Sequence, residues 1–497
     1  MNQSTFLAAI DLGSNSFRLE IGRNDHGQIQ RIDYLKETVR LGNGFDDERN
    51  LSIDTMARGW ECLARFSERL AGFKAHQVRA VATQTLREAR NRDEFLQRGS
   101  VILGFPIEVI AGTEEARLIY QGVAHLLPHS DERRLVIDIG GRSTELVLGQ
   151  ELQTIETASY RVGSVAWSMK YFPKGDFTEH AIYSAEIAAQ AVLDEALSRY
   201  PRSQWDCAYG ASGTVGAVAD ILTMAGWPQG QISAEGLNWL VKCMLRAGNA
   251  NNLRLEGLKE DRRAVLGGGV CVLRGLMDLL HIETLQVAQG ALRHGVLFEM
   301  LERGEHKSDA RDTSVARLAQ KFGVDSAQAN RVRTVSTLLL EKIIAPTEPP
   351  ASQLIRKLGW AAELHEVGMA ISHSDYHKHS AYILQNADLL GFSMQELFRL
   401  GALVLGHRGK LKKLETEFGE PDFAKLLLAF RLAIILCHAR KEPETDKLQL
   451  TCNNNKHSFK LVVNADWSLR YPQSAHLLRQ ENLAWQKAAW SFEFVGG

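Results

Sequence analysis

The sequence has few cysteines, and they lie far apart along the chain. Its six cysteines are spread over 497 residues, and no two stand at a Cys-x-x-Cys spacing. A dense disulfide scaffold and a zinc knuckle are therefore excluded, and this cysteine usage fits a reducing compartment.

Long hydrophobic runs are also missing. The most apolar stretch, residues 426–437, is short and is interrupted by Arg431, whereas a bilayer-spanning helix needs about 20 apolar residues. Residues 1–10 contain no Lys or Arg and too short an apolar run for a signal peptide. We expect a cytoplasmic protein without a transmembrane segment, and peripheral membrane association stays open.

No excess of charge of one sign exists over the whole chain. The 58 Lys and Arg nearly balance the 59 Asp and Glu, so we expect no nucleic-acid partner. The distribution is uneven, with a net charge of −5 in residues 1–303 and +4 in residues 304–497. This difference is either ordinary scatter or the mark of a C-terminal module that helps to hold an anionic ligand.

A repeat organises the first part of the chain. Residues 8–22 align with residues 135–149, and each copy has an apolar strand, Asp-x-Gly, a polar turn containing Ser and a second apolar strand. Two strands joined by a tight turn form a β-hairpin. The repeat therefore predicts two similar subdomains that each open with a hairpin.

The chain between and after the hairpins changes character once. Strand patterns followed by helical patterns or Gly turns predict mixed α/β subdomains up to about residue 302; these strands are residues 78–82, 107–111, 207–209 and 285–288. Apolar spacing near 3.6 then predicts helices over 314–320, 326–344, 353–365 and 394–405, with a Pro-containing loop at 345–350. Strands at 448–451 and 459–463 predict a small α+β cap.

The repeated turns have the chemistry of a phosphate site. A turn rich in Gly and Ser leaves backbone N–H groups pointing inward, which suits phosphate oxygens, and Ser16, Ser143 and Thr144 add hydroxyl donors. Asp11 and Asp138 precede the turns at strand ends, where a carboxylate can hold a divalent cation or its water.

A family resemblance rests on six motifs in one order. The paired hairpins resemble the phosphate loops of the actin, sugar kinase and Hsp70 superfamily. Within it, the chain resembles the exopolyphosphatase and guanosine pentaphosphate phosphatase (Ppx/GppA) family through residues 11–16, 83–87, 112–118, 138–146, 210–214 and 290–295.

This resemblance implies the architecture. We expect two actin-like (ribonuclease H-like) α/β subdomains with the active site in the cleft between them, an HD-like all-α domain and a small α+β cap. The expected boundaries are 1–125, 126–303, 304–443 and 444–497.

The resemblance also implies catalytic residues. Glu114 and Glu115 open a predicted helix, where acidic residues also complement the helix dipole; the family's catalytic base matches Glu115. That base would accept a proton from the attacking water, and Arg87 would clamp a phosphoryl group. No Cys, Ser or His stands in the context of an activated nucleophile, which favours direct attack by water.

The ligand-binding residues follow from the same motifs. Phosphate binding is expected at Gly13, Ser14, Asn15, Ser16, Gly140, Gly141, Ser143, Thr144 and Gly213. Mg²⁺ is the expected cofactor, with K⁺ as a further candidate. Asp138 is its stronger ligand, with Glu145 across the hairpin and Asp11 as additional candidates. Mg²⁺ prefers one or two carboxylates plus water and phosphate, so no all-protein cage is expected.

The sequence departs from the family pattern at two places. Arg142 stands in the second loop where the family usually has a small residue, and it could point outward or add a phosphate contact. In the helical region Glu366 stands where an HD site needs Asp, so a second catalytic metal site is not expected. The basic clusters around His377 and Arg408 predict either a passage for a polyanion or a solvated loop.

The predicted activity is processive removal of terminal orthophosphate from inorganic polyphosphate by base-activated water. The alternative is hydrolysis of the 5′ γ-phosphate of guanosine 5′-triphosphate 3′-diphosphate (pppGpp), and residues 364–368 and 379–386 favour the exopolyphosphatase branch. A sugar-kinase-like transferase or a non-enzymatic nucleotide switch are the alternatives from other classes. The resemblance further implies a homodimer.

Overall fold

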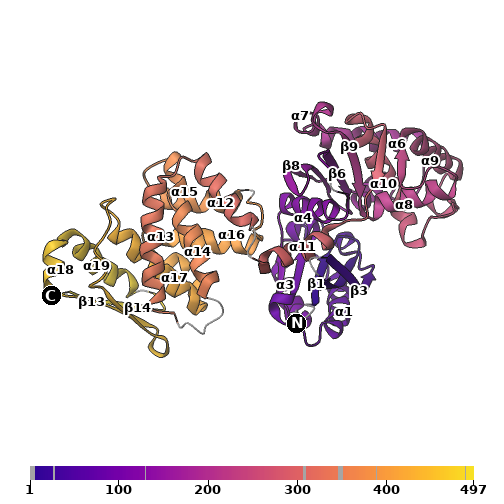
Figure 1. The fold of residues 1–497 in the computed structure, drawn as a ribbon. Coiled ribbons are helices and arrows are strands. Elements are labelled where there is room, and N and C mark those ends of the chain that lie inside the picture. Colours follow the sequence, from indigo (N-terminus) through magenta and orange to yellow (C-terminus); the bar gives the residue numbers. More distant parts are fainter. Residues whose placement is uncertain are drawn as a thin grey trace. The chain divides into compact units, whose positions relative to one another are not determined.

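The computed structural model describes residues 6–25, 28–128, 130–305, 309–344, 351–387, 389–486 and 488–496. The predicted loop at 345–350 lies outside these residues. The chain divides into two compact units, Met1–Ser308 and Asp309–Gly497, which Figure 1 colours from indigo through magenta to coral and from coral through orange to yellow. Each unit is described by itself.

The first unit contains two sheets with the same core topology. The first sheet has the order β3-β2-β1-β4-β5 and the second the order β10-β11-β9-β6-β7-β8. In both, an antiparallel three-stranded meander continues into parallel strands. The strands are β1 (Phe6–Leu12), β2 (Phe17–Asp25), β3 (Gln28–Glu37), β4 (Val78–Ala82), β5 (Ile107–Val109), β6 (Arg133–Ile139), β7 (Thr144–Gln150), β8 (Gln153–Tyr160), β9 (Cys207–Ala211), β10 (Gln231–Ser233) and β11 (Thr284–Val287).

This arrangement is the actin-like fold that the sequence predicts. Both predicted hairpins are present as β1–β2 and β6–β7, and the predicted strands near residues 78, 107, 207 and 285 are β4, β5, β9 and β11. The edge strands β3, β8 and β10 were not predicted, because their residues lack a strong apolar pattern.

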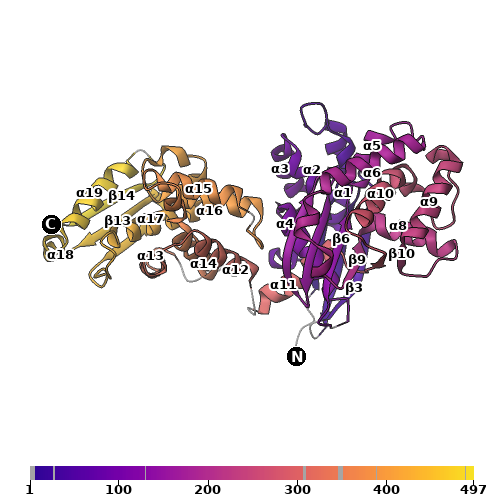
Figure 2. The same ribbon diagram turned by 90° about the horizontal axis from the view of Figure 1, so that it is seen from above.

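Helices cover these sheets and also lie between them. The helices of the first unit are α1 (Ile53–Arg69), α2 (Gln84–Glu88), α3 (Arg92–Leu103), α4 (Gly112–Ala124), α5 (Ser164–Tyr171), α6 (Glu179–Leu193), α7 (Ala196–Arg199), α8 (Ser212–Met224), α9 (Ala234–Ala247), α10 (Glu260–Leu279) and α11 (Leu292–Glu305). Figure 2 shows α5, α6, α8, α9 and α10 grouped beside the second sheet.

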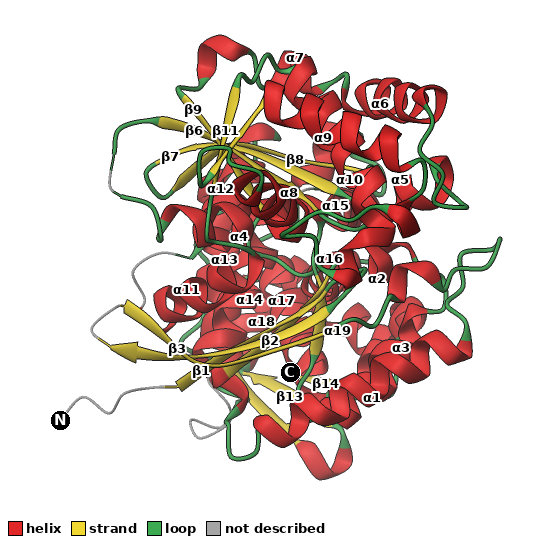
Figure 3. Cartoon of the chain, turned by 90° about the vertical axis from the view of Figure 1, so that its right-hand side faces the viewer, coloured by secondary structure: helices red, strands yellow, loops and turns green. Residues whose placement is uncertain are grey.

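Helices α4 and α11 join the two halves of the unit. They pack against each other, and side chains from both form one buried cluster with residues of β1, β4, β6, β7 and β9. Figure 3 shows α4 and α11 near the strands of both sheets. Because Ile119 and Val123 of α4 are buried in that cluster, the helix is fixed against both sheets.

The second unit is mainly helical. Its elements are α12 (Ala310–Lys321), α13 (Ser326–Glu341), α14 (Ala351–Leu364), α15 (Tyr376–Asn386), α16 (Met394–Gly406), α17 (Pro421–Leu436), α18 (Ala465–Arg470), α19 (Pro472–Trp485), β12 (Gln449–Asn453), β13 (Ser458–Val463) and β14 (Ser491–Gly496). The strands form one sheet of order β12-β13-β14.

Helices and sheet of the second unit share one hydrophobic core, in which Phe430, Phe459 and Trp485 are fully buried. The predicted helices and the predicted α+β cap are confirmed. The HD-like character of the helices and the exact domain boundaries stay predictions. Over the part of the chain that the structure describes, every helix is too short or too polar to span a membrane.

A buried ionic cluster fastens α11 to the first sheet. Glu20 of β2 accepts from Arg293 at 3.3 Å and lies 3.3 Å from the Nε2 atom of His294, while Arg31 of β3 donates to it at 3.2 Å. Burial alone would raise the pKa of Glu20, but the hydrogen bond with His294 and the neighbouring cations lower it to about 2.

We predict that Glu20→Gln lowers the free energy of unfolding at pH 7 by about 2 kcal/mol. The folded-state pKa of Glu20 lies below its ordinary value of 4.5, so this contribution is present above pH 4.5 and is lost as the pH falls toward 2. Urea unfolding of the wild type and of Glu20→Gln should therefore show a gap between their free energies of unfolding that is smaller at pH 3 than at pH 7. Exposed Glu61→Gln is the control, and an equal gap at both pH values would contradict the prediction.

Candidate active site

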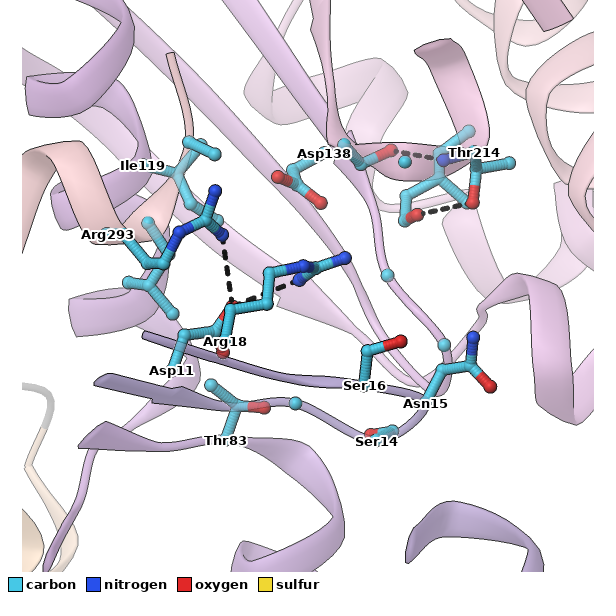
Figure 4. A pocket seen from close by; sticks show the side chains of 18 of the residues that line it. Asp11, Ser14, Asn15, Ser16, Arg18, Thr83, Ile119, Asp138, Thr214 and Arg293 are labelled. Atoms are coloured by element: carbon cyan, nitrogen blue, oxygen red, sulfur yellow. Dashed lines mark hydrogen bonds and ion pairs between the residues drawn. The ribbon is translucent and has the colours of Figure 1, made fainter. Parts of the chain in front are cut away.

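A polar cavity of about 460 Å³ opens between the two hairpins of the first unit. Its walls include the turns after β1 and β6, the start of α8, and the loop before α11 (Figure 4). The predicted residues that line it are Asp11, Gly13, Ser14, Asn15, Ser16, Glu115, Asp138, Gly140, Gly141, Ser143 and Gly213.

The two turns approach each other closely. A Cβ atom at Gly141 would lie 3.1 Å from the Cβ atom of Ser14 and 3.3 Å from Val165, so a side chain there would push the turns apart. Two polar atoms of the first turn, the Oγ of Ser16 and the Nδ2 of Asn15, are buried without a hydrogen-bond partner. Buried polar atoms normally have partners, so these atoms are suited to a bound phosphate.

The hydroxyls of two predicted phosphate ligands, Ser14 and Thr144, form hydrogen bonds within the protein. Thr144 is fully buried, is not among the lining residues, and donates to the carbonyl of Val162 at 2.6 Å. Ser14 lines the cavity, and its Oγ accepts from Thr85 at 2.8 Å. The Thr144 hydroxyl therefore holds the second turn in shape in this structure.

The two hairpins differ at one pair of facing residues. In the first, Asp11 stands opposite Arg18, whose Nη1 atom donates a hydrogen bond to its carboxylate at 3.1 Å. In the second, Asp138 stands opposite Glu145. Because like charges that face each other across a sheet repel, the second hairpin concentrates negative charge where the first one balances it.

Burial strengthens this repulsion. It raises the pKa of Asp138 to about 7, with further contributions from Glu115 and Asp11. Burial, together with Glu115 and Asp138, also raises the pKa of Glu145 well above its ordinary value. Glu145 accepts from Ser159 at 2.8 Å and is not among the residues lining the cavity.

The residues present fit a magnesium ion. Mg²⁺ takes one or two carboxylates together with water and phosphate oxygens, and a cation would relieve the repulsion among Asp11, Asp138 and Glu145. In the described ranges, no group of three or more His, Cys, Asp or Glu side chains has the geometry of a metal site. Water and substrate would therefore complete the shell around Asp138.

Glu115 lies in the first turn of α4, with its carboxylate held by Arg87. The Nη1 atom of Arg87 donates to Glu115 at 2.7 Å and to the carbonyl of Ile110 at 2.9 Å, and its other nitrogens donate to Gln84. Burial raises the pKa of Glu115, while the contact with Arg87 opposes that rise. The structure thus brings the two predicted catalytic residues together, and Arg87 contacts Glu115 and is not among the residues that line the cavity.

Several cations of the cavity were not predicted from the sequence; they are Arg18, Lys36, Lys259, Arg262 and Arg293. Arg18 and Arg293 lie near Asp11 at 3.1 and 3.7 Å (Figure 4). Aligning the two hairpins could have identified Arg18. It occupies the position of Glu145, a predicted metal ligand in the second copy, and stands opposite Asp11 as Glu145 stands opposite Asp138. Lys36, Lys259 and Arg262 had no such signal.

Arg262 stands out among these cations. A Cβ atom at Gly213 would lie 2.1 Å from its Nη2 atom, so the predicted phosphate ligand Gly213 makes room for this guanidinium. Burial and the neighbouring Arg18 lower the pKa of Arg262. Two arginines from different halves of the unit thus line the same cavity, which favours an anionic ligand there.

Three histidines of the second unit form a cluster. His365 and His407 are buried with ring centroids 5.4 Å apart, and His377 lies 6.1 Å from His407. Glu366, which stands where an HD site needs Asp, pairs with Arg440 at 2.8 Å. The predicted polyanion passage along this cluster stays a prediction.

Comparison with known proteins identifies the family. The model described as Ppx/GppA phosphatase family matches residues 21–304, and that of Ppx/GppA phosphatase, domain III, matches residues 310–486. The chain belongs to the Ppx/GppA phosphatase family. It is therefore a hydrolase that acts on phosphoanhydride bonds.

Relatives match nearly the whole chain. A guanosine-5′-triphosphate,3′-diphosphate pyrophosphatase of Vibrio cholerae is 35% identical over 492 residues, covering 97% of both chains. One of Pseudoalteromonas translucida is 36% identical over 491 residues, covering 98% of both.

Solved structures match a smaller part of the chain. The Ppx/GppA family member of Aquifex aeolicus is 25% identical with a TM-score of 0.52, covering 62% of this chain and 100% of that one. An exopolyphosphatase-like protein is 26% identical with a TM-score of 0.54, covering 60% of this chain and 98% of that one.

We predict that Asp138→Asn raises the Mg²⁺ concentration needed for half-maximal phosphoanhydride hydrolysis and lowers the maximal rate. Its thermal unfolding midpoint should not fall, because a carboxylate with a raised pKa is unfavourable when ionised. Titrating Mg²⁺ in a phosphate-release assay measures the effect, with exposed Asp93→Asn as the control. An unchanged Mg²⁺ requirement would assign Asp138 a structural role.

Proposed function

We propose that this chain hydrolyses the terminal 5′ phosphate of pppGpp to give ppGpp and orthophosphate. The oxygen of a water molecule forms a bond to the γ-phosphorus, and the bond from that phosphorus to the β–γ bridging oxygen breaks. The bridging oxygen leaves with the electron pair on the β-phosphate.

The observation that carries this proposal is the similarity over the whole length of the chain. The relatives that cover 97–98% of it are named for guanosine-5′-triphosphate,3′-diphosphate. The sequence alone favoured polyphosphate as the substrate. These relatives instead favour the nucleotide.

The charge of the cavity supports the same substrate. Arg18 and Lys36 come from the first sheet, whereas Lys259 and Arg262 come from around the start of α10 in the second half. A guanosine with phosphate groups at both its 5′ and 3′ positions presents negative charge on two sides of the ribose. Cations on two walls can hold both groups while the terminal 5′ phosphate reaches the turns.

Glu115 is the proposed base. Its carboxylate lines the cavity and would take the proton of the attacking water before passing it to solvent. A pKa raised by burial makes this carboxylate a stronger base than an exposed glutamate. Arg87 would act through Glu115, fixing the direction of its carboxylate.

The two turns would bind the terminal phosphate, and the metal site would neutralise its charge. The backbone N–H group of Gly13 and the hydroxyl of Ser16 would hold the oxygens of the terminal phosphate, while the N–H of Gly140 donates to the carbonyl of Ser143 at 2.9 Å and shapes the second turn. A bound Mg²⁺ would neutralise charge that develops on the phosphate oxygens. Asp138 would hold that ion, with Glu145 and Asp11 near it.

Inorganic polyphosphate is the second candidate substrate. It is favoured by the exopolyphosphatase-like protein of known structure, which is 26% identical and covers 60% of this chain. The net charge of +4 in residues 304–497 would also suit a long polyanion. A homodimer and a K⁺ ion stay predictions for either substrate.

The substrate is tested by a parallel phosphate-release assay on pppGpp and long-chain polyphosphate at equal enzyme concentration. We expect kcat/KM for pppGpp to exceed that for polyphosphate by about tenfold or more, a difference of about 1.4 kcal/mol in transition-state stabilisation. Faster release from polyphosphate would instead make the exopolyphosphatase activity the main one.

We predict that Glu115→Gln lowers kcat about 10²–10⁴-fold with KM within about threefold, because glutamine cannot accept the proton. Stopped assays with saturating substrate measure the loss. Glu114→Gln is the matched control, since Glu114 is fully buried and accepts two hydrogen bonds of 2.8 Å from Arg117. Glu114→Gln should lower the thermal unfolding midpoint but change kcat less than about threefold. If Glu115→Gln also changes kcat less than about threefold, Glu115 is not the base.

A further inference from the structure

Arg142 is the residue of the second turn that departs from the family pattern. Its φ is not among the positive values of the described residues, so the backbone of the turn accommodates a side chain there. The side chain is not among those that line the cavity. It therefore does not replace a phosphate ligand, and its contacts show what it does instead.

These contacts all reach the other half of the first unit. The Nη1 atom of Arg142 donates to the carbonyl of Gly42 at 3.0 Å, and its Nη2 atom lies 3.3 Å from the Oε2 atom of Glu88. Its guanidinium also lies 4.8 Å from the ring centroid of Phe45. A small residue at this position could make none of these contacts.

Glu88 also contacts a residue closer to Glu115. Its second oxygen, Oε1, accepts from the Nε2 atom of Gln84 at 2.7 Å. The Oε1 atom of the same Gln84 amide accepts from the Nε and Nη2 atoms of Arg87 at 3.0 and 2.6 Å. Arg87 in turn donates to Glu115 at 2.7 Å. One continuous series of hydrogen bonds thus links the second turn to the base.

The direction of each bond makes the series cooperative. An amide that donates to a carboxylate on one side and accepts from a guanidinium on the other can be oriented in only one way. Arg142 holds Glu88 at the far end of this series. Without it, the mostly buried Glu88 carboxylate would keep its hydrogen bond from Gln84 but lose the partner of its Oε2 atom. It could then turn toward Arg87, in competition with Glu115.

We propose that Arg142 is a positioning residue, which sets the orientation of Glu115 through Glu88, Gln84 and Arg87 when the two halves of the cleft are together. This inference rests on the proposed role of Glu115 as the base. It goes beyond that role because it makes the second phosphate-binding turn, in the opposite subdomain, part of the support of the base.

Arg161 provides a matched comparison in the same half of the unit. It approaches the same Glu88 carboxylate, but at 4.0 Å and with a side chain that is 72% exposed. An exposed ion pair at this distance contributes little. If only the charge near Glu88 mattered, both arginines would act alike; if the geometry of the series matters, only Arg142 acts.

The test compares Arg142→Ala, Arg142→Lys, Glu88→Gln and the double variant Arg142→Ala/Glu88→Gln, with pppGpp and polyphosphate as substrates. We expect Arg142→Ala to lower kcat about tenfold with KM within about twofold, since the base is misplaced while the phosphate site stays intact. Arg142→Lys should restore part of kcat. Glu88→Gln should lower kcat, and the double variant should lose less than the product of the two single losses.

Arg161→Ala is the control and should change kcat less than about twofold. Unchanged kcat in Arg142→Ala, a raised KM with kcat unchanged, or losses that multiply in the double variant would overturn the proposal. Failure of the proposed function is recognised separately in the same assay. Wild-type enzyme that does not cleave pppGpp, or active Glu115→Gln, would refute the substrate or the base whatever the Arg142 variants show.

Discussion

The repulsion among buried carboxylates is the constraint on which this active site depends. Asp11, Glu115 and Asp138 line one cavity, and Glu145 stands opposite Asp138 in the same hairpin. Their charges are balanced in different ways: Arg18 pairs with Asp11, Arg87 with Glu115, and Asp138 is left with a pKa raised to about 7. Arg18 and Arg293 offset the charge of Asp138 only in part. The remaining negative charge lies at the proposed substrate and metal site, so binding there would complete the balance.

The fold makes this arrangement possible by holding two half-sites against each other. Each hairpin supplies one turn, and α4 and α11 lie in a buried cluster shared by both sheets. Glu115, the proposed base, lies at the start of α4, while the ionic cluster of Glu20 with Arg293 and His294 fastens α11. Loops alone would not hold charged groups this close, because their mutual repulsion would separate them.

The sequence predicted the parts of the site that depend on local pattern. The hairpins around Asp11 and Asp138 follow from apolar strands around a Gly and Ser turn, and these residues line the cavity as predicted. Arg262 could not be found this way, because it lies on a helix more than 200 residues from Arg18, and the two line one cavity only in the folded chain. The contacts of Arg142 and Thr144 likewise depend on which atoms the packing brings near them.

The central claim is that Glu115 directs water onto the terminal phosphorus in a single step, without a phosphoenzyme. The stereochemical course at that phosphorus tests it most directly, using a substrate whose terminal phosphate is made chiral with oxygen isotopes and sulfur. One in-line displacement inverts the configuration, so the account predicts inversion in the released thiophosphate. Retention would require two displacements through a covalent intermediate and would contradict the account.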